Sequence, residues 1–150
     1  MKAQALTIAG ILLAVLPLSG LGQKTQHEDA SSFQKISSYS TTYLERAARN
    51  LRAGLNSGNE GAVETAVAYS SFLRVAAPQL EMSDIREELA VVAVSGSTPA
   101  IRYKAFLATI VFENPTAFES ALRIDGIDGD RFFAEVSEQA SKTLFGYRSN

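Results

Sequence analysis

Few residues of this chain are of types that could carry out catalysis or bind a metal. Their scarcity excludes several kinds of functional site. His27 is the only histidine and there is no cysteine, which excludes a histidine-rich or thiolate zinc site, a thiol nucleophile and disulfide bonds. His27 lies in a polar segment near the N-terminus, whereas a general base needs a fixed neighbour and a pocket. The sequence contains no Walker-type loop, GxSxG motif or dinucleotide-binding fingerprint.

The acidic residues do not match a calcium-binding or hydrolytic pattern either. The stretch DGIDGD, from Asp125 to Asp130, could be a calcium loop, but both possible EF-hand registers place hydrophobic residues or glycine at ligand positions. It is typical of a turn in which Asp128 or Asp130 caps the following helix. Glu87 and Glu88 are adjacent, so on a helix their carboxylates diverge instead of facing one another across a cleft. We therefore predict no catalytic residue, no cofactor and no metal site.

Arg102, Tyr103 and Lys104 form the most promising polar cluster. On a helix these three residues span about 200° of the surface, so they cannot all face one partner. We expect Arg102 to bridge neighbouring structural repeats, Tyr103 to pack at a seam and Lys104 to be solvated. The alternative is that Tyr103 and Lys104 contribute to a partner-binding surface.

The elements that would position these residues follow an N-terminal leader. Residues 1–22 combine Lys2, an apolar run and the small residues Gly20 and Gly22, a pattern that predicts a cleaved secretory signal peptide. The apolar run is about a dozen residues long, shorter than a membrane anchor requires. We expect an exported protein, periplasmic or extracellular, with no membrane contact after cleavage. Residues 23–38 are mostly polar and indicate a linker or a loose N-terminal helix.

Residues 39–150 carry the apolar spacing of amphipathic helices. The run AVVAV (90–94) could be a buried strand, but it continues the helical spacing from Ile85 and has no partner strand. The run AFLATIVF (105–112) has Thr109 as its only polar residue, which predicts a helix buried on several sides. We therefore expect an all-α domain of six helices.

Two stretches of the chain nearly repeat one another: SGNEGAVETAV from Ser57 and SGSTPAIRYKA from Ser95. A shift of about 38 residues aligns them, and a helix–turn–helix unit of that length is typical of stacked helical repeats. A third unit, from Pro115 to the end, matches in pattern only, as a terminal capping repeat would. The fold that we predict is three stacked helical hairpins.

The segment TPAIRYKA, from Thr98 to Ala105, resembles the start of the second helix in HEAT-type repeats. In that family an arginine at the place of Arg102 often bonds an acid or amide in an adjacent inter-helix turn, which implies Asn59 or Glu60 as its partner. The first repeat has Glu64 where the pattern has arginine, so a Glu64–Arg102 pair between repeats is the natural substitute. The resemblance implies a short HEAT-like α-solenoid.

HEAT-like modules mostly bind other proteins, so the resemblance implies a non-catalytic binding or scaffold role, typically on the concave face of the second helices. The net charge of −2 gives no reason to expect nucleic acid as a partner. One alternative is an enzyme or enzyme subunit acting on envelope polymers, which would have a cleft with acids of raised pKa. Another is a carrier of a small apolar ligand, which would have a deep apolar cavity. The sequence leaves the partner and the oligomeric state open.

Overall fold

The structure is a computed structural model that describes residue 36, residues 39–123 and residues 128–145. The predicted signal peptide (1–22), nearly all of the predicted linker (23–38) and the first part of the DGIDGD stretch lie outside these residues. The described elements are all helical, and they are α3 (Thr41–Leu55), α4 (Glu60–Ala76), α5 (Ser83–Ser95), α6 (Pro99–Glu113), the 3-10 helix η1 (Pro115–Arg123) and α7 (Gly129–Phe145). The expected all-α class is confirmed for this part of the chain, and AVVAV lies within α5.

The helix starts follow from local capping. The side-chain oxygens of Ser40, Asn59 and Thr98 each accept a hydrogen bond from the backbone N–H three residues later, at the starts of α3, α4 and α6. These bonds satisfy N–H groups that have no partner within the helix. Pro99 follows Thr98 in the first turn, where its missing N–H costs nothing.

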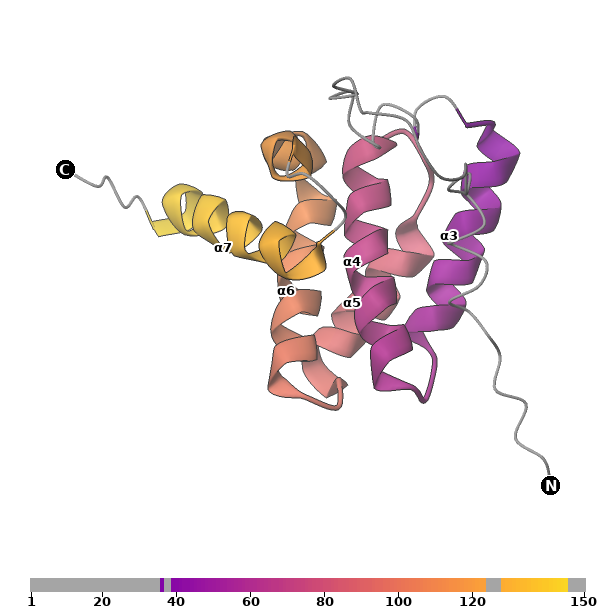
Figure 1. The fold of residues 1–150 in the computed structure, drawn as a ribbon, viewed down its shortest axis with the longest axis horizontal. Helices are drawn as coiled ribbons and strands as arrows, with labels where there is room; N and C mark the ends of the chain where they lie inside the picture. Colours follow the sequence, from indigo (N-terminus) through magenta and orange to yellow (C-terminus); the bar gives the residue numbers. More distant parts are fainter. Residues whose placement is uncertain (1–35, 37–38, 124–127, 146–150) are drawn as a thin grey trace, which may run out of the picture.

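The first four helices form two antiparallel hairpins that lie side by side. Helix α3 packs against α4 and α5 against α6, while α3 also contacts α5 and α4 contacts α6. Figure 1 shows the α3–α4 and α5–α6 loops together at the lower end of the molecule. First helices are therefore next to first helices, and second helices next to second helices.

The third unit differs from a third stacked hairpin. Its first element is the 3-10 helix η1, and α7 begins beside α4 and runs across α6 instead of along it (Figure 1). Both elements pack mainly against α4, α6 and each other. The reason is the wide apolar arc of α6, because Leu107 and Val111 need cover beyond the face that meets α4 and α5. Phe118, Ala121 and Leu122 of η1 are buried, which is the inner face that the spacing predicts.

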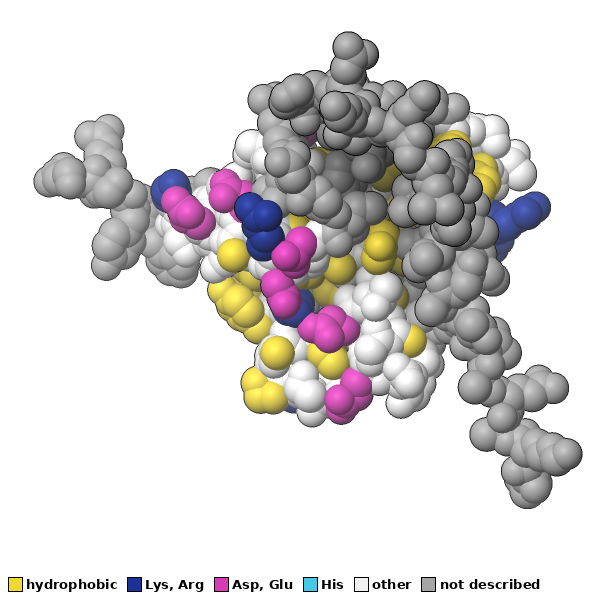
Figure 2. All heavy atoms as spheres, in the orientation of Figure 1, with side chains coloured by type: hydrophobic (Ala, Val, Ile, Leu, Met, Phe, Trp, Pro, Cys, Tyr) yellow, Lys and Arg dark blue, Asp and Glu magenta, His cyan; other side chains and the backbone are white. Residues whose placement is uncertain are grey.

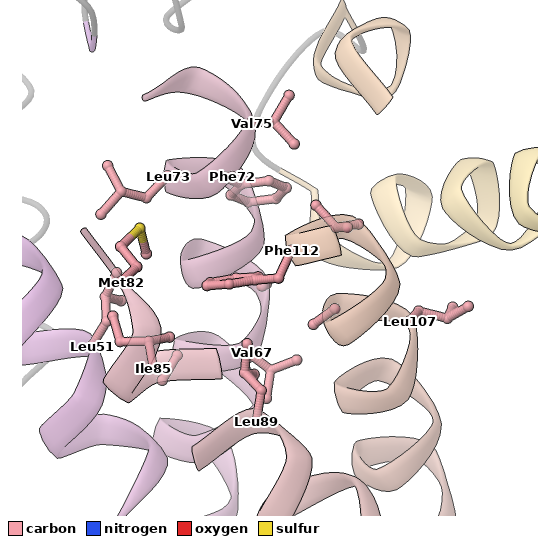
Figure 3. Packing of buried hydrophobic residues seen from close by; sticks show 14 of the residues in the cluster. Leu51, Val67, Phe72, Leu73, Val75, Met82, Ile85, Leu89, Leu107 and Phe112 are labelled. Carbon is pink, nitrogen blue, oxygen red and sulfur yellow. The ribbon is translucent and has the colours of Figure 1, made fainter. Parts of the chain in front are cut away.

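The core lies between the two hairpins and under the third unit. Figure 3 shows Leu51, Val67, Ile85, Leu89 and Phe112 converging from α3, α4, α5 and α6. The segment AFLATIVF is buried on several sides, as its composition predicts, except that Phe106 is 50% exposed. None of the described helices is long and apolar enough to cross a bilayer.

Close contact between α3 and α4 depends on Gly54. A Cβ atom at Gly54 would lie 2.9 Å from the Cβ of Ala66, closer than two carbon atoms can approach. Both positions are on helix backbones, so α3 and α4 would have to separate to admit a methyl group. Glycine avoids this clash, although it costs about 1 kcal/mol of helix stability relative to alanine.

We expect Gly54→Ala to lower the free energy of unfolding by about 1–2 kcal/mol, because overpacking a core costs about 1–3 kcal/mol and exceeds the gain in helix propensity. Urea denaturation followed by circular dichroism measures the change. Gly61→Ala in the first turn of α4 is the matched control, since a Cβ there meets only Asn59 Oδ1 at 3.4 Å. It should be neutral or stabilising, and equal effects at the two sites would contradict the packing argument.

Candidate functional site

An open hollow of about 300 Å³ lies where α4, α6 and the start of α7 meet. The residues that matter most in its lining are Glu64, Tyr69 and Phe72 of α4, Lys104 of α6, and Asp128 and Asp130 at the start of α7. Figure 2 shows acidic side chains gathered around a basic one in the middle of this face. The hollow is therefore bordered by charge and has aromatic walls.

Lys104 is the centre of the charged network. Its Nζ donates to Glu64 Oε1 at 2.6 Å and also to Asp130 Oδ1, so a single ammonium joins α4, α6 and α7. The side chain is only 18% exposed, which contradicts the expectation that Lys104 is solvated. Burial alone lowers the pKa of Lys104, but the hydrogen bonds and negative charges of Asp130 and Glu64 outweigh burial and raise the pKa above 10.5. The ammonium is therefore charged at neutral pH.

The start of α7 is capped locally and lies close against α4. Asp128 Oδ1 accepts hydrogen bonds from the backbone N–H groups of Asp130 at 2.9 Å and Arg131 at 3.3 Å, which caps the helix as the sequence predicts. Gly129 lies so close to α4 that a Cβ there would be 3.2 Å from the Cβ of Ala68. This approach brings Asp130 within reach of Lys104.

Aromatic contacts hold the wall of the hollow. Phe72 lies edge-on to Tyr69, with ring centres 5.5 Å apart, and to Phe132 of α7 at 4.7 Å. Phe132 in turn meets Phe133 at 5.2 Å. Such edge-to-face pairs stabilise the contact by about 1 kcal/mol each beyond burial. Tyr69 is half-buried and lines the hollow.

Arg102 does not make the predicted bridge between the repeats. Its Nη1 donates to the carbonyl of Gly96 at 2.7 Å, in the loop of its own hairpin, whereas Glu64 pairs with Lys104. Asn59 caps α4 instead of receiving Arg102. The physical reason is the repeat itself: equivalent positions point the same way, so Glu64 points from α4 towards α6 and Arg102 points from α6 away from α4. The alignment of the two repeats, which pairs Glu64 with Arg102, already indicates this difference in direction.

Tyr103 links α6 to α7 and remains accessible. Its hydroxyl is 2.7 Å from the Oγ of Ser137, and either oxygen can be the donor. The residue is nevertheless 52% exposed. Of the sequence-predicted site residues, only Glu64 and Lys104 therefore come together, and sequence analysis missed Tyr69, Phe72 and the role of Asp130.

Replacing Lys104 with methionine removes the ammonium and keeps the apolar stem. We expect the free energy of unfolding to fall by about 1 kcal/mol at pH 7, the upper end for partly exposed ion pairs. Because folding raises the pKa of Lys104 above 10.5, this contribution is fully present below pH 10.5 and is lost as the pH rises through the higher folded-state value. Urea unfolding of both proteins from pH 7 to about pH 11 should show the difference narrowing.

Lys142→Met is the control, since Lys142 pairs with Glu138 at 2.5 Å on the exposed face of a single helix. It should change stability less than Lys104→Met does. A difference between wild type and Lys104→Met that stays constant across the pH series would contradict the role of the charged network.

Among the described residues, no group of three or more histidine, cysteine, aspartate or glutamate side chains is placed to hold a metal ion. The chain matches no protein-family model, no curated protein and no solved structure. A function for this protein must therefore be inferred from the hollow and its surroundings.

Proposed function

We propose that this chain is a non-catalytic binding module of the cell envelope or exterior, in which the hollow between α4, α6 and α7 recognises an arginine side chain of a partner protein. The observation that carries the proposal is the composition of the hollow. Its lining combines three carboxylates, of Glu64, Asp128 and Asp130, with the ring of Tyr69 and one ammonium, that of Lys104.

The charges of the hollow favour a cationic ligand. Three carboxylates and one ammonium leave an excess of negative charge. Glu64 and Asp130 each give one oxygen to Lys104, but their side chains are 47% and 80% exposed, so further acceptor positions face solvent. The planar guanidinium group has five N–H donors in a fork that matches carboxylates, which makes arginine a better fit than lysine.

The aromatic wall and the size of the hollow agree with this ligand. Tyr69 presents a ring held by its edge contact with Phe72, and guanidinium groups stack on such rings. A volume of about 300 Å³ is at the lower end of the range for small-molecule sites. It suits one side chain of a larger partner.

The same proposal includes a HEAT-like repeat architecture and export. In repeat proteins of this kind each unit packs on its neighbour, and the arrangement of α3–α4 beside α5–α6 supports this interpretation. The second helices form the usual binding face in that family, and α4 and α6 both line the hollow. The leader pattern of residues 1–22 supports secretion.

Two other functions fit the site less well. An enzyme acting on envelope polymers needs a carboxylic acid free to transfer a proton, whereas Glu64 and Asp130 are both engaged by the ammonium of Lys104. A carrier of apolar molecules needs a deep apolar cavity, whereas this hollow is open and bordered by acids.

The proposal predicts selective binding of arginine peptides. In an NMR titration, a blocked Gly-Arg-Gly peptide should shift the amide signals of residues 64–69 and 128–133 at lower concentration than Gly-Lys-Gly, and Gly-Met-Gly should shift neither. Asp130→Asn keeps the shape and removes one negative charge, so it should weaken arginine binding at least fivefold.

Glu87→Gln is the matched control, because Glu87 is exposed on α5 and does not line the hollow. It should leave arginine binding unchanged. Equal binding of the three peptides, or an equal loss with both variants, would argue against recognition by the hollow. Degradation of envelope polymers by the purified protein would favour the enzymatic alternative.

A further inference from the structure

We propose that two copies of this chain associate about a twofold axis through a stripe on α6 formed by Arg102, Phe106, Thr109 and Glu113. This inference goes beyond the proposed function, because the stripe lies on the opposite side of α6 from Lys104 and the hollow. It depends on the geometry of one helix and on what the third unit leaves uncovered.

The four residues form one straight stripe. They are separated by four, three and four positions, which at 100° per residue keeps them within about 60° of the helix surface and about 16 Å from end to end. Steps of three and four residues are the spacing by which paired helices interlock along a seam. The spacing is also the same from either end of the stripe, so two antiparallel copies can align residue for residue.

Phe106 and Glu113 of the stripe are exposed, Arg102 and Thr109 are half-buried, and the stripe has unused bonding capacity. Phe106 is 50% exposed, within a segment whose other apolar residues are buried or half-buried, and Tyr103 beside it is 52% exposed. Glu113 is exposed, and Arg102 uses one nitrogen for the Gly96 carbonyl. The guanidinium group therefore has further N–H donors for a second acceptor.

Charge order selects a second copy, in antiparallel orientation, as the occupant. If two α6 helices meet head to foot, with the axis between Phe106 and Thr109, Arg102 of each copy faces Glu113 of the other. Phe106 of each copy then packs on Thr109 of the other. Parallel pairing would place like charges opposite one another, which is unfavourable. The stripe is thus complementary to itself, as a twofold interface requires.

The size of the contact predicts a weak dimer. One pair of helices buries less area than the roughly 1,200 Å² at which stable interfaces begin. The end pairs are open to solvent, so salt will screen them. We expect association to appear at tens to hundreds of micromolar protein and to weaken as the ionic strength rises.

Sedimentation velocity at protein concentrations from about 10 µM to 1 mM tests whether the dimer forms. The protein is used as it is purified from the cells that produce it. Glu113→Arg alone and Arg102→Glu alone should each weaken association at least tenfold, because like charges then meet at both ends. An equimolar mixture of these two variants should associate again, because their charges are complementary at both ends of an antiparallel pair.

Controls separate the interface from the fold. Arg102→Glu also removes the bond to Gly96, so circular dichroism and a thermal melt must show a folded protein; Glu113→Arg leaves that bond intact. Arg49→Glu changes an exposed arginine on α3 and should leave association unchanged. A monomer at every concentration, a dimer unaffected by Glu113→Arg, or a mixture that stays monomeric would each overturn the proposal. Arginine-peptide binding is measured separately, so either proposal can fail alone.

Discussion

The structure depends on how closely other elements can approach α4. This helix contacts α3, α6, η1 and α7, and a helix enclosed on so many sides needs small residues at the points of closest contact. Ala66 lies against Gly54 of α3, and Ala68 lies against Gly129 at the start of α7. Ser71 is fully buried and donates its hydroxyl to the Val67 carbonyl at 3.0 Å, so this polar group does not need water. A larger side chain at these contacts would move a neighbouring helix rather than fill a space.

The hollow is a consequence of that packing. Because Gly129 lets the first turn of α7 meet α4, Asp130 arrives beside Lys104, and Glu64 reaches the same ammonium from α4. A lysine at this depth needs opposite charge, since burial alone disfavours the ammonium and lowers its pKa. The acids supply that charge and still have oxygens open to solvent, so the interaction that joins three elements also gives the surface its negative character. Stability and recognition are therefore linked through the same side chains.

The sequence was informative wherever the signal was local. Helical spacing predicted the helices, including α5 where AVVAV could have been a strand, and the segment TPAIRYKA indicated the start of α6. The contacts of Arg102 and Lys104 were predicted wrongly because they depend on which side of α6 faces α4. The alignment of Glu64 with Arg102 in the two repeats indicates that side, whereas the resemblance to HEAT-type repeats implies the opposite pairing. The orientation of the third unit could not be predicted, because it is a tertiary property. Burial of Phe118 and Leu122 follows from spacing, but the path of α7 across α6 follows from which apolar arcs were still uncovered.

That crossing has a consequence that joins the two proposals. A third hairpin stacked on α5–α6 would cover the outer stripe of α6, whereas η1 and α7 cover the other side and leave Phe106 at the surface. Because the same stripe would be used by both copies, association would close at two chains and could not extend into a filament. The hollow lies on the opposite side of α6, so each copy would keep its own hollow accessible. Recognition of a single arginine is weak by itself, and two hollows on one dimer would raise the apparent affinity for a partner that presents two arginines at a matching distance.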